Sequence, residues 1–477
     1  MNHSLFPSFL RRPQPARLLL VAAMACAFSA GLYAQNKPAP RSISEKVGEA
    51  FQKLKPLQEA KDYDGMIALL DGLAPTVDPS SYDMALILDM KAKLYGQKEQ
   101  FDKAIASWES MIHISEPKEY FDKKMRLETR LYLAQFCYQV GVNSKVPAIQ
   151  QQYVNKSADY FKRWMADTPK PPAEILMFYA SILYNQAVAD PKKVNMELLK
   201  QSQKQVEDGL VNSAHPKEGL YVLLLAILQQ QNDTVRSAEV LEQLVKQYPA
   251  KKDYWPSLWA TYLNMANEAT ISDNKSESRA RENYIRSINT MERAQAVGLM
   301  KSPKDNLTLV NLYLTAGQFG RATDLLYAGL KNGAIESDPK NWQTLGYFYQ
   351  QGNAEQKAIA ALTEASSLFP KTGQFELQIG QIFLGMERTK DAYAHFKVAL
   401  KRGGLDKPHS VYQALAYAAF ELEEFDEALS ACNEAEKFPE GKKDTQLPRL
   451  KGAIEAAIKE REYAKAEAAK DAAKKLL

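Results

Sequence analysis

Side chains able to carry out catalysis are scattered along this chain rather than gathered in a motif. The five histidines are His3, His113, His215, His395 and His409, each in a different stretch of the sequence. No H-E-x-x-H, C-x-x-C, G-x-S-x-G or phosphate-loop pattern occurs, and these are the patterns typical of zinc, redox, acyl-transfer and nucleotide sites. We therefore expect no catalytic residue, no metal ligand and no cofactor, and a protein that is not an enzyme.

One short run does match a catalytic signature. The sequence SDNK at Ser272–Lys275 fits both S-x-x-K and S-D-N, which in penicillin-binding enzymes are separate motifs. Here they overlap in one polar loop, Thr270–Glu277, so coincidence is the favoured interpretation. A competing hypothesis is an enzyme whose unrecognised site lies in one of two longer units, Tyr120–Thr168 or Asp253–Met300.

The N-terminal segment has the layout of an export signal. Arg11, Arg12 and Arg17 precede the apolar run Leu18–Ala30, and Leu32-Tyr33-Ala34 before Gln35 resembles a small-residue cleavage site. The run is shorter than the roughly 20 residues that a membrane span needs. We expect a signal peptide over residues 1–34 cleaved after Ala34, a flexible linker over 35–42, no transmembrane span in the mature chain, and location in the periplasm of a Gram-negative bacterium.

Cysteine placement leaves a second possibility for this segment. Cys26 ends a run, AMAC, that resembles a lipobox, so a lipid anchor at Cys26 is an alternative to cleavage after Ala34. The other cysteines, Cys137 and Cys432, are 432 − 137 = 295 residues apart. We expect both to be free, buried thiols that pack as small apolar side chains.

The charge of the chain gives no sign of a nucleic-acid partner. Lysine and arginine number 61 against 57 acidic residues, a formal charge of +4. Removing the three signal-peptide arginines leaves 4 − 3 = +1, so no basic footprint remains.

Repeated amphipathic helices organise the rest of the chain, most clearly at Pro339–Thr372. Trp342, Leu345, Gly346 and Tyr349 are spaced i, i+3, i+4 and i+7, which places them on one face of a helix. Gly352 and Asn353 predict a turn. A second helix carries apolar or small residues at the same helical spacing and ends at a proline; these residues are Ala358, Leu362, Ala365 and Pro370.

This pattern is similar to the tetratricopeptide repeat, a helix–turn–helix unit of about 34 residues. Counted from Pro339, the eight residues occupy positions 4, 7, 8, 11, 20, 24, 27 and 32. Alanines at position 20 recur at Ala322, Ala358, Ala392 and Ala428, with spacings of 36, 34 and 36 residues. The resemblance implies an all-α fold, a right-handed α-solenoid of about ten tetratricopeptide-like hairpins with a C-terminal capping helix.

The regularity of the repeat divides the chain into regions. We expect tetratricopeptide-like hairpins over residues 43–118, central and partly stretched hairpins over 119–302, and regular repeats over 303–442. Residues 443–477 are expected to form a capping helix whose end is a frayed tail.

The resemblance also implies a binding surface. In tetratricopeptide repeats, positions 2, 5, 9 and 12 of the first helix usually line a concave groove. Amides and tyrosines there suit recognition of a peptide, although plain solvent-facing polarity is an open alternative. The family's carboxylate clamp is not reproduced. The candidate groove residues are Lys304, Asn311, Lys340, Gln343, Tyr347, Gln350, Gln374, Gln381, Gln413, Tyr417 and Phe420.

A narrower resemblance concerns three stretches, Lys252–Trp255, Ala294–Gly317 and Lys340–Asn353. They look like the exported repeat proteins encoded beside TonB/ExbB/ExbD energy-transduction systems. This implies a non-catalytic periplasmic scaffold for protein-protein interaction that acts as an accessory to TonB-dependent uptake. Its implied partners are TonB, ExbB or ExbD components. A lipid-anchored outer-membrane assembly scaffold is the alternative within the same class.

The two hypotheses for the N-terminus predict different mature proteins. Mass spectrometry of the exported protein should find a first residue of Gln35, because signal peptidase cuts after small residues. An acylated N-terminal Cys26 would contradict this expectation and favour the lipid-anchored scaffold.

Overall fold

The computed structural model describes residues 42–272 and 277–476, and the structural statements below refer to these residues. The expected signal peptide, nearly all of the linker and Cys26 lie outside the described residues. So do residues 273–276, which include most of the SDNK run.

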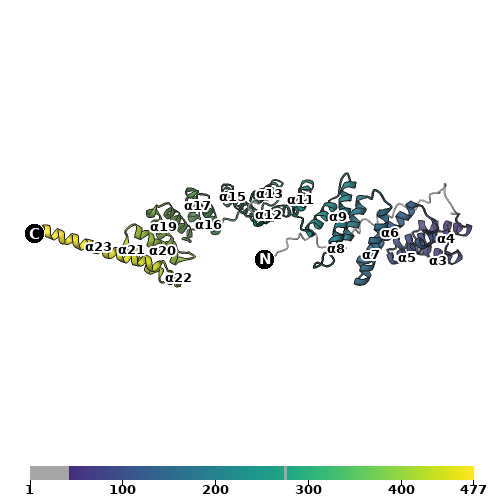
Figure 1. Cartoon of the computed structure of the whole chain (residues 1–477), viewed down its shortest axis with the longest axis horizontal. Helices are drawn as coiled ribbons and strands as arrows, with labels where there is room; N and C mark the ends of the chain where they lie inside the picture. The colour runs from purple at the N-terminus through teal and green to yellow at the C-terminus, as the bar shows by residue number, and fades with distance from the viewer. Residues whose placement is uncertain (1–41, 273–276, 477) are drawn as a thin grey trace. The chain divides into compact units, whose positions relative to one another are not determined.

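Helices follow one another along the described chain, and no strand interrupts them there (Figure 1). The first eleven elements are α2 (Glu45–Glu59), α3 (Tyr63–Leu73), the 3-10 helix η3 (Ala74–Thr76), α4 (Tyr82–Gln97), α5 (Phe101–Ser115), α6 (Lys123–Asn143), α7 (Pro147–Ala166), α8 (Ala173–Ala187), α9 (Met196–Asn212), α10 (Glu218–Gln230) and α11 (Thr234–Gln247).

The remaining helices continue in the same way. They are α12 (Tyr254–Ser272), α13 (Glu277–Ala296), α14 (Pro303–Thr315), α15 (Phe319–Asn332), α16 (Pro339–Gln351), α17 (Glu355–Leu368), α18 (Gln374–Gly385), α19 (Thr389–Arg402), α20 (Pro408–Glu421), α21 (Phe425–Ala435), α22 (Pro439–Lys442) and α23 (Leu447–Leu476).

The chain divides into two compact units, with the division between Leu244 and Val245, inside α11. In the first unit α2 packs on α3, α4 on α5, α6 on α7 and α8 on α9, and each pair packs on the next. In the second unit the pairs are α12–α13, α14–α15, α16–α17, α18–α19 and α20–α21, and α23 packs on α21. Each unit is thus a stack of helical hairpins.

This arrangement confirms the predicted fold class, an all-α solenoid of tetratricopeptide-like hairpins. The capping position expected for the C-terminal helix is also seen, since Leu447 and Ile454 of α23 are buried in the core of the second unit. The expected regional boundaries at 118, 302 and 442 describe repeat regularity and stay predictions.

The turn between the two helices of a hairpin is the same in four successive repeats. Gly317, Asn353, Glu387 and Glu423 all stand at position 15 and have positive φ angles of 72°, 53°, 60° and 65°. A left-handed residue reverses the chain tightly after the first helix. The recurrence at one position shows that the repeat numbering derived from the sequence is the numbering of the fold.

The two helices of a hairpin approach closely at the small residues. A Cβ atom on Gly346 would lie 2.7 Å from the Leu362 side chain, and one on Gly380 would lie 2.6 Å from the Phe396 ring. The position-20 alanines Ala322, Ala358, Ala392 and Ala428 are fully buried.

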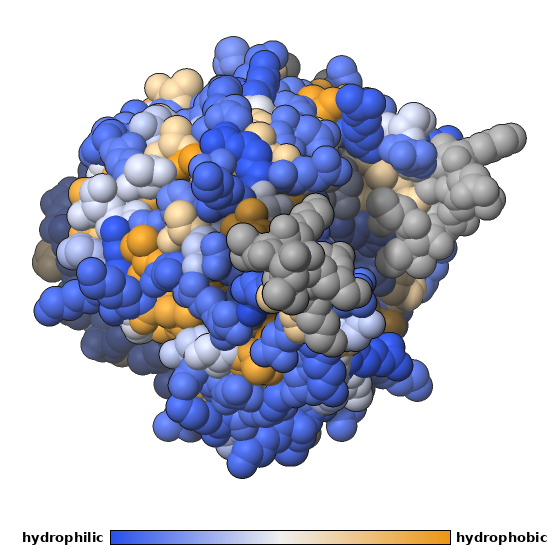
Figure 2. Space-filling view, turned by 90° about the vertical axis from the view of Figure 1, so that its left-hand side faces the viewer, coloured by the Kyte–Doolittle hydropathy of each residue, from blue (hydrophilic) through white to orange (hydrophobic). Residues whose placement is uncertain are grey.

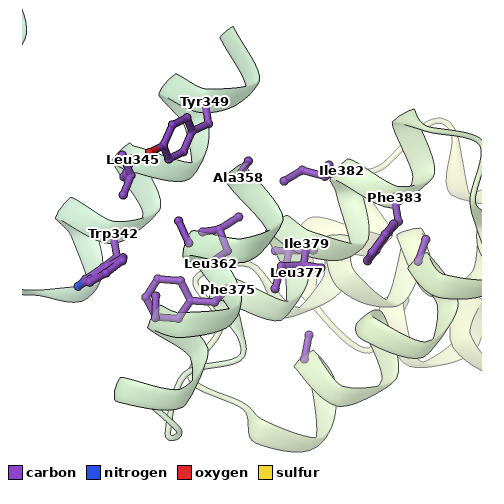
Figure 3. Close-up of a cluster of buried hydrophobic side chains, with 14 of the residues drawn as sticks. Trp342, Leu345, Tyr349, Ala358, Leu362, Phe375, Leu377, Ile379, Ile382 and Phe383 are labelled. Carbon is purple, nitrogen blue, oxygen red and sulfur yellow. The ribbon is translucent and has the colours of Figure 1, made fainter. Parts of the chain in front are cut away.

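Figure 3 shows the resulting core in the repeats that begin at Pro339 and Gly373, called repeats 339 and 373. Trp342, Leu345 and Tyr349 from α16 face Ala358 and Leu362 from α17. The same cluster continues into α18 through buried side chains that the figure labels Phe375, Leu377, Ile379, Ile382 and Phe383. One continuous core therefore joins successive hairpins of the second unit.

Some predicted boundaries are wrong by a few residues. The loop expected from Thr270 begins later, because α12 continues to Ser272. In the longer unit expected to start at Tyr120, the first helix begins at Lys123, because the Asp122 carboxylate accepts a hydrogen bond from the Met125 amide at 2.8 Å and caps the helix. These differences reflect local capping, which the repeat pattern does not specify.

The described residues also bear on the cysteines and on membrane spans. Cys137 and Cys432 are free and buried, as predicted. None of the described helices combines the length and the apolar character needed to cross a membrane.

Enlarging a position-20 alanine should destabilise the stack. Ala358→Leu adds three carbon atoms where Ala358 is fully buried, and such overpacking costs about 1–3 kcal/mol of unfolding free energy. The exposed Ala360 on the same helix provides a matched control, since Ala360→Leu should leave stability nearly unchanged. Thermal and denaturant unfolding measure both, and equal midpoints for the two variants would contradict the close approach.

Candidate functional site

The predicted groove residues all lie on first helices of the second unit, and none is buried. They come from α14, α16, α18 and α20. Those classed as exposed are Lys304, Asn311, Lys340, Tyr347, Gln381 and Tyr417, and those of intermediate exposure are Gln343, Gln350, Gln374, Gln413 and Phe420. The structure thus places all of them on the solvent side of the first helices. Their role in binding stays a prediction.

Neighbouring first helices touch on this side. Gln378 of α18 donates a hydrogen bond from Nε2 to the backbone carbonyl of Gln343 in α16, at 3.4 Å. Gln350 donates to the Gly346 carbonyl at 3.3 Å within α16. We call the solvent side of α14, α16, α18 and α20 the first-helix face, and its contact between α16 and α18 makes it continuous across two hairpins.

Large exposed apolar side chains are few in hairpins 303–442. They are Tyr347, Leu368, Val398 and Tyr417, and the two tyrosines are 53% and 44% exposed. Seen from the side of α23, apolar residues form small areas among mostly hydrophilic ones (Figure 2). Exposed aromatic rings in this region therefore belong to position 9 of the first helices, where they can serve as rigid contact area for a partner.

Charge is divided between the two kinds of helix. At positions 2, 5, 9 and 12 of the four first helices there is no acidic residue, and the two cations are Lys304 and Lys340. Some acidic residues of the second helices are instead bonded to side chains of the preceding second helix. Glu364 of α17 accepts hydrogen bonds from Tyr327 and Lys331 of α15, and the hydrogen bond from Lys331 lowers the pKa of Glu364.

A polar cluster centred on the buried Glu376 was not identified from the sequence. Glu376 of α18 is 7% exposed. Its Oε2 lies 2.6 Å from Nδ1 of His395, and its Oε1 accepts a hydrogen bond from the Ser366 hydroxyl at 2.5 Å. Arg402 completes the cluster, with Nη2 3.1 Å from Oε1 of Glu376 and Nη1 donating to the Ser366 carbonyl at 3.0 Å.

The charges around Glu376 stabilise its ionised form. The hydrogen bond with His395 lowers the pKa of Glu376, and the Ser366 hydroxyl and the Arg402 charge lower it further, while burial opposes them. Glu376 stands at position 4, where Trp342 stands in the preceding repeat. An acidic residue at a core position of the repeat is the signal by which the sequence could have indicated this cluster.

The cluster contains serine, histidine and glutamate, but its connectivity differs from that of a hydrolase. In a catalytic triad the histidine lies between the serine and the carboxylate. Here the carboxylate lies between Ser366 and His395, so the imidazole does not take the serine proton. The arrangement joins α17, α18 and α19, which indicates a structural role.

The free thiols are also poor nucleophiles. Burial raises the pKa of Cys137 to about 12 and that of Cys432 to about 11. Both thiols are therefore protonated at neutral pH, and the thiolate is the reactive form.

The stretched units, where an unrecognised enzyme site was considered, carry ordinary interhelix contacts. In the unit of α6 and α7, Lys156 and Tyr160 both bond to Glu109 of α5 at 2.9 Å. In the unit of α12 and α13, the Tyr284 hydroxyl donates to Asn267 at 2.9 Å. Among the described residues no group of three or more histidine, cysteine or acidic side chains is placed to hold a metal ion.

The geometry defines an array of tetratricopeptide-like hairpins, and comparisons with known proteins add little detail. No protein-family model matches the chain. The Protein CTR9 homolog of Arabidopsis thaliana is 29% identical over 106 residues, which is 21% of this chain and 10% of that protein. The chain therefore matches about a tenth of the length of this curated relative.

Several solved structures of repeat proteins align with parts of the chain. The APC/C hetero-tetramer Cut9–Hcn1 aligns with 87% of this chain and 77% of its own at 15% identity and a TM-score of 0.27. YrrB, described as a TPR protein with an unusual peptide-binding site, aligns with 44% and 96% at 15% identity and the same score. A tetratricopeptide repeat protein from Parabacteroides merdae aligns with 60% and 98% at 12% identity, again at 0.27. Scores this low carry no functional information, and the fold rests on the hairpin geometry described above.

The Glu376 cluster should make the free energy of unfolding depend on pH in the acid range. Because the folded-state pKa of Glu376 lies below the ordinary value of 4.5, its contribution is present above that pH and is lost as pH falls below it. Glu376→Gln should lower the unfolding free energy at neutral pH by about 1–3 kcal/mol, since hydrogen bonds to the charged group are lost. The gap between wild type and variant should shrink as pH falls below 4.5.

Denaturant unfolding between pH 3 and pH 7 measures this gap. The exposed Glu421 supplies the control, since Glu421→Gln should change stability little at any of these pH values. A gap for Glu376→Gln that stays constant as the pH falls would contradict the proposed linkage.

Proposed function

We propose that this protein is a non-catalytic, exported scaffold that holds a segment of a partner protein on the first-helix face of hairpins 303–442. The observation that carries the proposal is the character of that face. It combines exposed amides and tyrosines with the absence of acidic residues at positions 2, 5, 9 and 12. Stacked hairpins offer such extended surfaces to other proteins, and this is their common use.

The chemistry of the face suits a polypeptide better than a small molecule. An amide side chain has both a donor and an acceptor, so Gln343, Gln381 and Gln413 can pair with the backbone of an extended segment. Tyr347 and Tyr417 add rigid area at little cost in conformational entropy. The face is a surface of several helices rather than an enclosed site, which favours a long ligand.

The cellular setting is proposed from the sequence. The signal-like segment of residues 1–34 supports export to the periplasm. The likeness of Ala294–Gly317 and Lys340–Asn353 to exported repeat proteins encoded beside TonB/ExbB/ExbD systems supports a role as an accessory to TonB-dependent uptake. On this proposal TonB, ExbB or ExbD is the protein whose segment the face holds.

Photo-crosslinking in cells tests the proposal. A benzophenone amino acid at position 347 of the full-length exported protein should form a crosslink to TonB, ExbB or ExbD, identified by mass spectrometry. The same probe at the exposed Tyr463 of α23 should not. Crosslinks of equal yield from both positions would overturn the placement of the site, and a crosslink from 347 to other proteins would overturn the TonB assignment.

Substitution provides the quantitative counterpart. Gln343→Ala with Tyr347→Ala should leave the thermal midpoint nearly unchanged, because neither side chain is buried, and should weaken capture of the crosslinked partner by about tenfold or more. Gln356→Ala with Tyr463→Ala removes the same side-chain types from exposed positions elsewhere and should have no effect. If the variant with Gln343→Ala and Tyr347→Ala still captures the partner, and substitutions on first helices of the first unit abolish capture, the site is wrongly placed.

A further inference from the structure

Positions 5 and 9 of the four first helices repeat with a period of two hairpins. At position 5 the series is Leu307, Gln343, Leu377 and Gln413; at position 9 it is Asn311, Tyr347, Gln381 and Tyr417. One hairpin has leucine at position 5 and an amide at position 9, and the next has glutamine at position 5 and tyrosine at position 9. Equivalent positions are 373 − 303 = 70 and 409 − 339 = 70 residues apart.

The backbone follows the same period. Helices α15 and α19 end at Gly333 and Gly403, which have φ angles of 78° and 70°. Helices α17 and α21 end instead at Phe369 and Glu436, whose φ angles are negative. A glycine with positive φ therefore follows every second hairpin, so the alternation extends to the backbone.

Contacts between second helices group the hairpins in pairs. Tyr327 and Lys331 of α15 both bond to Glu364 of α17. Tyr393 and Lys397 of α19 both bond to Glu427 of α21, the lysine at 2.9 Å. In each case a tyrosine and a lysine four residues later, on one second helix, hold a glutamate on the next.

The contact between the two pairs is of another kind. Its polar contacts include those of Glu376, with Ser366 of α17 on one side and His395 and Arg402 of α19 on the other. Two hydrogen bonds to backbone carbonyls also cross it, from Gln378 to Gln343 and from Thr372 to Gly404. Residues 303–372 and 373–442 are therefore two similar modules, which we call double hairpins.

We propose that the first-helix face carries two similar subsites, centred on Tyr347 and Tyr417, one in each double hairpin. Their occupant is an extended protein segment, neutral or acidic, with two aromatic anchor side chains about six residues apart. This rests on the proposed function and specifies the partner that the same face selects.

The charge of the face determines which net charge the bound segment should have. The cations at the four face positions, Lys304 and Lys340, both belong to the first double hairpin and have no acidic counterpart at these positions, so that half of the face repels a basic segment and attracts an acidic one. Aromatic anchors follow from the exposed rings, because aromatic pairs gain about 0.5–1.5 kcal/mol beyond the area they bury.

Helix packing gives the anchor spacing. Packed helices lie about 8–10 Å apart, so first helices two hairpins apart are separated by roughly 20 Å along the face. An extended chain advances about 3.3 Å per residue, which makes about six residues between anchors. Because both tyrosines stand at position 9, the two subsites lie at the same level of their helices.

Synthetic peptides test this on the full-length protein. The probes are extended Ser/Gly/Asp peptides with two phenylalanines separated by four to eight residues, one peptide with a single phenylalanine, and a set with Lys in place of Asp. Fluorescence polarisation should show tightest binding near a separation of six, about tenfold or more tighter than the single-phenylalanine peptide. The Lys set should bind more weakly than the Asp set.

Variants separate the two subsites. Tyr347→Ala and Tyr417→Ala should each reduce binding of the best two-anchor peptide to about the level of the single-anchor peptide, because either loss removes the avidity. Tyr463→Ala, which removes an exposed tyrosine of α23, should have no effect.

Three results overturn the proposal. The first is that peptide affinity does not depend on the separation of the two phenylalanines. The second is that only one of the two tyrosine variants loses affinity, and the third is that no two-anchor peptide binds. None of them affects the crosslinking result at position 347, so failure of the two-subsite arrangement and failure of the proposed function are distinguishable.

Discussion

The structure depends on how closely the two helices of a hairpin can approach. At Gly346 and Gly380 a single methyl group would collide with Leu362 and Phe396, so the side chain of the second helix packs directly on the backbone of the first. This close approach fixes the hairpin but leaves its outer sides apolar. Each hairpin must therefore bury these sides on its neighbours, and stacking follows from the same constraint.

The joint between hairpins is built in more than one way. In repeat 339, position 4 is Trp342, whose ring is buried and whose indole N–H donates to Ser337 at 2.9 Å. In repeat 373 the same position is Glu376, which is held by three polar neighbours. An apolar ring and a satisfied carboxylate both fill the position, but the carboxylate requires partners from both adjacent second helices.

The division of charge between helices gives the second unit two different surfaces. Second helices carry acidic residues that are bonded to tyrosine and lysine of the preceding second helix, as at Glu364 and Glu427. At positions 2, 5, 9 and 12 the first helices carry amides, tyrosines and two lysines, and no acidic residue. Stability is thus reinforced on one surface, and the other is left with hydrogen-bonding groups available to a partner, which is the basis of the proposed scaffold role.

The repeat numbering could be predicted from the amino-acid sequence, because spacing on a helix is local: the turn at Asn353, the buried Ala358 and the exposed position-9 tyrosines all followed from counting residues. The sequence did not determine the surroundings of Glu376, because Ser366, His395 and Arg402 come from two other helices and meet only when three hairpin elements stack. Nor did it indicate that Glu364 and Glu427 join hairpins in pairs. Those contacts depend on which turns of neighbouring second helices face each other, and only the tertiary packing of the hairpins decides that.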